Sequence, residues 1–280
     1  MRVYCIRLLS MEEGAFLSAN IEGKRCAVFA EGGVHMKSKL AEVLKLRYQP
    51  IAIYFTNDRP EGAISLPEGK WACVVGMVTA AMRGRTVCLS RKTVTCWGGG
   101  VGMCFGNWYP NFPGGIEYFL STGRGEGYRA GELYKQSPEL AKSFVDALPM
   151  TDVEAEYVVL RPLDLVPEGT EPDVVVMYAN CDQLSALVVL SNYDREGGEN
   201  VVFPFSAGCQ SICLLPYAER LRDKPRSVVG MADISARPLI DKDLLSFAVP
   251  YKRFVELEAN VEECFFKAEA WQRVAPRLAE

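Results

Sequence analysis

Short apolar runs and helical spacings alternate along the chain from about residue 36 onward. Leu40, Val43 and Leu44 recur on one face of residues 37–47, which predicts a helix. Runs rich in β-branched and aromatic residues, bounded by turn residues, predict strands at 50–55, 85–90, 154–160, 172–178, 201–203, 228–231 and 245–249. Residues 211–215 fit either a strand or a buried turn.

Further helices follow from spacing and from capping residues. Residues 71–83 form an apolar stretch that ends before Gly84, a residue type that favours a helix C-terminus. Ser137 and Pro138 supply the N-cap and the first position of a helix that runs to about residue 147. Other helices are expected at 116–122, at 183–190, and from Pro250 through Phe265. Together the elements predict an α+β fold, with mixed sheets and packed helices.

The first 35 residues show neither helical nor strand periodicity. We therefore expect residues 1–35 to be an N-terminal extension that is poorly ordered or loosely packed. A single α+β domain is expected at 36–280. Because Met36 opens the first clear pattern, initiation at Met36 is an alternative to a native extension.

The two halves of this domain share an order of events. A strand that begins with proline leads to a cysteine, Cys73 or Cys181, and an apolar helix follows. A turn and a strand then end at a second cysteine beside glycine, Cys96 or Cys209. The order suggests an internal repeat, with coincidence as the alternative. A pseudo-twofold axis between similar halves would bring Cys96 and Cys209 together, and the halves would be 36–150 and 151–280.

Composition and charge exclude several classes of protein. The chain has 280 residues, of which 49% are hydrophobic and 24% charged, as in ordinary globular proteins. Its 31 basic and 35 acidic residues give a net charge of −4 without a basic block, so no nucleic-acid partner is implied. No apolar run reaches the roughly 18 residues that would span a bilayer, and the N-terminus does not resemble a signal peptide. We expect a cytoplasmic protein without a membrane partner.

His35 is the single histidine of the chain. One histidine excludes a metal site with two or more imidazoles from the same chain. A serine or cysteine hydrolase would have to use His35 as its base, and the neighbouring Gly32 and Gly33 are a poor setting for a rigid base. No P-loop motif occurs, and the sequence at 125–130 that fits a dinucleotide motif follows a helical pattern instead of a strand.

Residues 96–115 combine seven glycines with five aromatic residues. This composition predicts a long irregular loop, in which glycines let the backbone approach a ligand and aromatic rings stack on it. A rigid loop that caps the core with its own rings is the alternative. The residues predicted to contact a cofactor here are Trp97, Gly98, Gly99, Gly100 and Trp108.

Ten cysteines are the main source of candidate chemistry. In a reducing compartment they would be thiols, metal ligands or redox groups instead of a disulfide framework. Cys73, Cys96 and Cys209 lie at the ends of predicted elements and are the candidate ligands of a soft metal ion or an iron–sulfur cluster. Two alternatives stay open: buried structural cysteines, or one reactive thiol activated by a basic neighbour such as Arg83, Arg85 or Arg91.

A polar cluster, 233–237, lies between two predicted strands. Asp233 and Arg237 could bind a charged ligand or pair with each other. We expect Arg237 to be a further cofactor contact.

Several short motifs together resemble a known family. The run Pro50–Phe55, Cys73 with its following helix, and Cys96-Trp97-Gly98-Gly99-Gly100 resemble the family of domain of unknown function 169 (DUF169). So do Ser137–Ala141, Arg161–Leu163, Pro172–Val175, Gln183, Gly208–Cys209 and Phe247–Tyr251. The resemblance covers about residues 38–260. It implies that Cys73, Cys96 and Cys209 are the cysteines that recur in the family, and it implies no established activity.

The sequence thus favours a cofactor- or metal-binding protein that uses thiols beneath a loop rich in glycine and aromatic residues. One alternative is a metal-free module that binds a small molecule and has structural cysteines. Another is a thiol-dependent enzyme, for which the sequence names no further catalytic residue. A face of the C-terminal helix would suit either the core or a homodimer contact.

Overall fold

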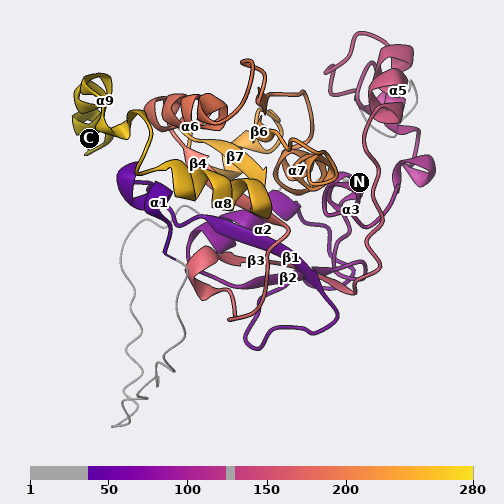
Figure 1. Cartoon of the computed structure of the whole chain (residues 1–280). Coiled ribbons are helices and arrows are strands. Elements are labelled where there is room, and N and C mark those ends of the chain that lie inside the picture. The colour runs from indigo at the N-terminus through magenta and orange to yellow at the C-terminus, as the bar shows by residue number, and fades with distance from the viewer. Residues whose placement is uncertain (1–36, 124–129, 280) are drawn as a thin grey trace, which may run out of the picture. The chain divides into compact units, whose positions relative to one another are not determined.

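A seven-stranded sheet forms the centre of the computed structural model, which describes residues 37–123 and 130–279 (Figure 1). The strand order is β2-β3-β1-β4-β7-β6-β5. Neighbours pair antiparallel except β5 and β6, which are parallel, so the sheet is mixed and the predicted α+β class is confirmed. The strands are β1 (Ile51–Thr56), β2 (Val87–Ser90), β3 (Tyr157–Pro162), β4 (Val174–Ala179), β5 (Val201–Val202), β6 (Ser227–Gly230) and β7 (Leu245–Pro250).

Alternating side chains of the central strands bury both faces of the sheet. In β4, Val174, Val176 and Tyr178 enter one apolar core, while Val175 and Met177 enter the other. A strand that is covered on both faces has no polar side, which explains why this run is continuously apolar.

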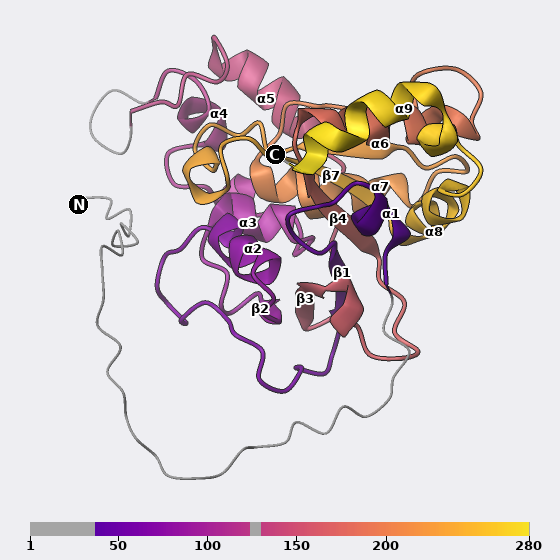
Figure 2. The same cartoon turned by 90° about the vertical axis from the view of Figure 1, so that its left-hand side faces the viewer.

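Helices cover the two faces in separate groups, and Figure 2 shows α2 and α3 on the side opposite α8 and α9. The first face carries α2 (Val74–Met82), α3 (Trp97–Gly102) and a helix at 208–219 that ends in α7 (Leu215–Glu219). The second face carries α1 (Lys39–Val43), α6 (Cys181–Tyr193), α8 (Tyr251–Asn260) and α9 (Glu269–Val274). The short α4 (Ile116–Phe119) contacts α5 (Pro138–Asp146), which lies away from the sheet (Figure 1).

Capping residues set the starts of several helices. Ser137 caps α5 by accepting a hydrogen bond from the Leu140 amide, with Pro138 at the first position as predicted. Asn180 and Gln183 form a reciprocal capping box, so α6 begins two residues before the predicted helix. The helix predicted from Pro250 through Phe265 ends at Asn260.

The prediction of an irregular loop over 96–115 was wrong for residues 97–102, which form α3. Glycine disfavours a helix when nothing compensates for its flexibility. Here packing compensates, because a Cβ on Gly99 would lie 2.6 Å from Val74 Cγ2 and one on Gly100 would lie 2.3 Å from the Trp108 ring. The glycines therefore allow α3 to pack closely against its neighbours.

The prediction of a strand or buried turn at residues 211–215 was wrong, because residues 210–214 form a π-helix and Leu215 begins α7, both inside helix 208–219. Pro216 lacks the amide that would donate to the Ile212 carbonyl in a regular α-helix, and this loss favours the wider turn. All five residues of the π-helix are buried.

The predicted pseudo-twofold repeat is not confirmed. Strand β3, from the C-terminal half, lies between β2 and β1 of the N-terminal half. The helices that would correspond, α2 and α6, lie on opposite faces of the sheet. The prediction for residues 1–35 lies outside the described residues.

Candidate functional site

Three cysteines from distant parts of the sequence gather at the starts of three helices. Cys73 is the N-cap of α2, Cys96 is the N-cap of α3, and Cys209 lies in the first turn of helix 208–219. The Cys209 thiol donates to the Gly98 carbonyl oxygen over 3.1 Å. A Cβ on Gly102 would lie 2.6 Å from Cys209 Sγ, so the two helices touch here. We call Cys73, Cys96 and Cys209 the thiol site.

The thiols of this site are close enough to influence one another's ionisation. Burial, and after it the neighbouring Cys96, raises the pKa of the Cys73 thiol to about 11. Burial also raises the pKa of Cys209 well above its ordinary value, with further contributions from Cys96 and Cys73. A negative charge on one sulfur therefore disfavours ionisation of the next. A cation placed among them would reverse this effect.

Asp233 adds a carboxylate beside the thiols. Its Oδ2 accepts a hydrogen bond from the Gly208 amide over 2.9 Å, which caps helix 208–219 from another segment. Its Oδ1 accepts from the amide and the hydroxyl of Ser235. The Asp233 charge contributes to the raised pKa of Cys73 and of Cys209, so it lies within electrostatic range of both.

Tyr109 and Gln210 form a buried polar pair at the same site. Gln210 Nε2 donates to Tyr109 Oη over 2.7 Å, and Gln210 Oε1 accepts from the Ala207 amide. Burial, followed by Cys209 and Cys96, raises the pKa of Tyr109, so its hydroxyl stays protonated at neutral pH. The sequence did not identify this pair, because a tyrosine in an aromatic segment and a glutamine after a cysteine carry no distinctive spacing.

Unusual backbone conformations surround the thiol site. Cys104, just beyond α3, has a φ of 59°, and Met231, just beyond β6, has a φ of 64°. The Met231 amide donates to Ser211 Oγ inside the π-helix at 210–214. Non-glycine residues with a left-handed backbone conformation, and π-helices, are both frequent at functional sites in proteins. Their presence here supports the choice of this region as the candidate site.

The residues predicted to contact a cofactor around α3 differ in what they pack against and in how far they are buried. The Trp97 ring meets the rings of Trp108 and Phe112 edge-on, with centroids 6.3 Å and 6.0 Å apart. Gly99 and Gly100 are buried by protein atoms. Gly98 is half-buried, and a Cβ there would meet only Tyr109 Oη, at 3.8 Å.

The Arg237 guanidinium is engaged with main-chain carbonyl groups. It donates to the carbonyl oxygens of Leu244, Lys242 and Asp241 over 2.6, 2.8 and 3.2 Å, and to Met231 over 3.5 Å. These bonds hold the segment that carries Asp233. Arg237 therefore acts on the site through the backbone that positions this carboxylate.

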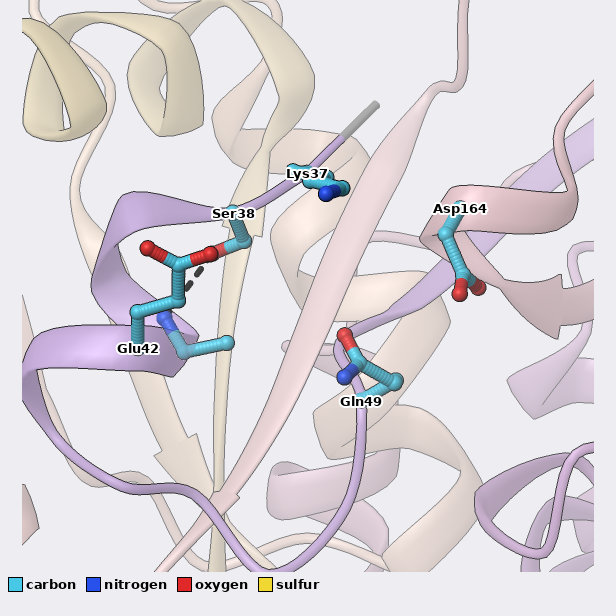
Figure 3. A pocket seen from close by; sticks show the side chains of 6 residues that line it. Lys37, Ser38, Glu42, Gln49 and Asp164 are labelled. Atoms are coloured by element: carbon cyan, nitrogen blue, oxygen red, sulfur yellow. Dashed lines mark hydrogen bonds between the residues drawn. The ribbon is translucent and has the colours of Figure 1, made fainter. Parts of the chain in front are cut away.

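A shallow hollow of about 220 Å³ lies elsewhere, beside α1 (Figure 3). Lys37, Ser38, Glu42, Gln49 and Asp164 line it. The Ser38 hydroxyl donates to Glu258 over 2.6 Å and accepts from the Ala41 amide over 3.0 Å. Ser38 thus already serves the start of α1, and none of the residues that line the hollow is a cysteine.

The described residues contain neither a ready metal site nor a helix that could span a membrane. No group of three or more His, Cys, Asp or Glu side chains within 37–123 and 130–279 is arranged to hold a metal ion. No helix in the same residues is long and apolar enough to cross a membrane.

Comparison with known proteins identifies the family. The model of the DUF169 family, described as "Uncharacterised ArCR", matches residues 39–260. The chain belongs to this family, which confirms the resemblance in the sequence. No curated protein and no solved structure matches the chain.

The raised pKa of Cys73 predicts slow alkylation at neutral pH. A pKa of about 11 instead of the ordinary 9.0 reduces the reactive thiolate about 100-fold. The rate with iodoacetamide should rise as the pH rises toward 11. Mass spectrometry of alkylated peptides measures it, with the exposed Cys181 as internal reference. If Cys73 reacted as fast as Cys181 at pH 7, the site would hold an activated thiolate, as in a thiol-dependent enzyme.

Proposed function

We propose that the protein binds a soft metal ion, or an iron–sulfur cluster, through the thiols of Cys73, Cys96 and Cys209. The observation that carries the proposal is the convergence of these three thiols from separate segments of the chain. Thiolates are the preferred ligands of soft and borderline metals and of iron–sulfur clusters. A cytoplasmic location, where thiols stay reduced, is part of the proposal.

The electrostatics of the site favour a bound cation. After burial, Cys96 raises the pKa of Cys73, and Cys96 and Cys73 raise the pKa of Cys209; Asp233 adds negative charge. Metal binding would release protons from the thiols and offset their mutual repulsion, so the affinity should rise with pH. Cys73, Cys96 and Cys209 would have to rotate toward one another to share one ion, because no such ligand set exists among the described residues.

In this proposal the predicted aromatic and glycine contacts around α3 shield the metal and position its ligands. Trp97, Gly98 and Trp108 lie on or beside α3 and would limit the access of water and of larger ligands. Gly99 and Gly100 let α3 pack closely, which positions Cys96 at its start.

Titration with Cu(I) in competition with a chromogenic chelator tests the proposal. Wild-type protein should bind Cu(I). Cys96→Ser should lower the affinity more than about 100-fold, because loss of a metal ligand weakens binding more than loss of a residue that only orients a ligand. Cys181→Ser is the matched control, since Cys181 is exposed at the start of α6. Equal affinities in wild type and Cys96→Ser would refute the proposal.

A metal-free module that binds a small molecule is the second candidate. The observation that favours it is the burial of Cys73 and Cys209, which raises the pKa of both thiols and suits neutral structural cysteines. Native mass spectrometry of the purified chain tests it. A co-purifying organic molecule, at one per chain and kept by Cys96→Ser, would support this candidate over the first.

A further inference from the structure

A second pair of thiols lies in the core of the first face. Cys104 Sγ and Cys213 Sγ are 4.0 Å apart, and both residues are fully buried. They come from positions 109 residues apart in the sequence. Cys104 follows α3, and Cys213 lies in the π-helix of helix 208–219. Neither belongs to the thiol site.

The backbones that carry this pair run close together. Gly102 lies two residues before Cys104, and a Cβ on it would lie 2.9 Å from the Cys209 carbonyl carbon. Cys209 lies four residues before Cys213 in the same helix. The sulfur atoms of a disulfide are about 2.05 Å apart, so closure requires each sulfur to move by roughly 1 Å. Side-chain rotation can supply a movement of this size.

We propose that Cys104 and Cys213 are an oxidisable dithiol that closes to an intramolecular disulfide. The oxidant is a small disulfide such as oxidised glutathione. Two S–H bonds of the protein and the S–S bond of the oxidant break, and one S–S bond forms between Cys104 and Cys213. The two electrons and two protons pass to the oxidant, which leaves as two thiols.

Burial sets the rate and the persistence of this disulfide. Exchange requires local opening of the core, because neither sulfur is exposed. The hydrogen bond with Cys104, and after it burial, also raises the pKa of the Cys213 thiol and so disfavours its thiolate. Closure is therefore slow. The disulfide joins residues 109 positions apart. A cross-link that closes a long loop restricts the unfolded chain more than one that closes a short loop. The oxidised protein should therefore melt at a higher temperature.

Closure would also act on the thiol site. It ties the end of α3 to the middle of helix 208–219, while Cys96 is the N-cap of α3 and Cys209 lies in the first turn of helix 208–219. A small shift of either helix changes the separation of those two thiols. This regulatory part rests on the proposed function, while formation of the disulfide does not.

Peptide mapping of the full chain tests the disulfide. The protein is equilibrated with oxidised glutathione, denatured, alkylated and digested without reduction. We expect a peptide linked through Cys104 and Cys213, two hydrogens lighter than the sum of its parts. Oxidation should raise the melting temperature of the wild-type protein but not that of Cys213→Ala. Cys264→Ala is the control, because it removes a cysteine that is buried on the other face of the sheet, and its melting temperature should rise as in wild type.

The outcomes separate this inference from the proposed function. Recovery of Cys104 and Cys213 as alkylated thiols at equilibrium, or a link between other cysteines, overturns the inference even if Cu(I) still binds. The mapping needs only the wild-type chain, so misfolding of a variant does not obscure it. Loss of Cu(I) binding in a protein that forms the link refutes the proposed function alone. If oxidised and reduced protein bind Cu(I) equally, the regulatory part is overturned; an affinity change of about 10-fold or more supports it.

Discussion

Gly102→Ala is expected to destabilise the protein by about 2–3 kcal/mol. The added Cβ would lie 2.6 Å from Cys209 Sγ, 2.8 Å from Cys209 Cβ and 2.9 Å from the Cys209 carbonyl carbon. Because two of these atoms belong to or adjoin the backbone, the clash cannot be relieved by rotating a flexible side chain. Helix α3 or helix 208–219 has to shift, which would also disturb the thiol site. Urea denaturation measures the change in the free energy of unfolding.

Gly76→Ala is the matched control for this substitution. Gly76 lies within α2, and a Cβ there would meet nothing within 4 Å. The same chemical change should stabilise the protein by about 0.5–1 kcal/mol, because alanine is the better helix former. Equal effects at Gly102 and Gly76 would contradict the close packing of α3.

Arg253→Met is expected to cost about 3 kcal/mol of stability. Arg253 is 1% exposed and joins α8 to α6. Its guanidinium donates to both carboxylate oxygens of Asp194, over 2.8 and 2.6 Å, to Glu256 over 2.7 Å and to the Ser191 carbonyl over 3.0 Å. Methionine keeps the apolar part of the side chain but removes this donor from Asp194 and from the Ser191 carbonyl, while Glu256 keeps its hydrogen bond from Arg195. We place the cost at the lower end of the usual range because Asp194 and Glu256 keep side-chain exposures of 29% and 33%.

The pH dependence of unfolding provides a second readout for Arg253. Its hydrogen bonds lower the pKa of Asp194 to about 2. An unfolded aspartate has a pKa near 3.9, so this contribution to stability is present above about pH 4 and is lost as the pH falls through about 2. Arg253→Met should lack this pH-dependent component.

Arg273→Met on α9 is the control for the loss of an arginine. Arg273 pairs with Glu269 four residues earlier, and their side chains are 77% and 83% exposed. An exposed pair of this kind contributes at most about 0.5 kcal/mol. A comparable loss at both arginines would mean that burial does not determine the cost.

Local patterns in the sequence predicted most elements of the sheet. The runs at Pro50, Pro172 and Leu245 are short, β-branched and bounded by turn residues, and they became β1, β4 and β7. The prediction failed where packing between distant segments decides the conformation. Three successive glycines indicate a loop in isolation, but contacts with Val74 and Trp108 make them helical.

The sequence pattern accounts for part of the grouping of the cysteines, while their role as ligands stays a prediction. Cys73, Cys96 and Cys209 lie at the ends of elements, and Cys96 and Cys209 lie close together in the structure. The repeat that led to this expectation is not confirmed, because α2 and α6 lie on opposite faces. Tyr109, Gln210 and the capping role of Asp233 depend on contacts between segments far apart in the sequence, which no local pattern encodes.

Metal-edge X-ray absorption of the Cu(I)-loaded chain tests the central claim most directly, because it counts the sulfur atoms bound to the metal. We expect a first shell of sulfur alone, with one sulfur fewer in Cys96→Ser and no change in Cys181→Ser. A first shell of nitrogen or oxygen, or the same sulfur count in wild type and Cys96→Ser, would contradict it.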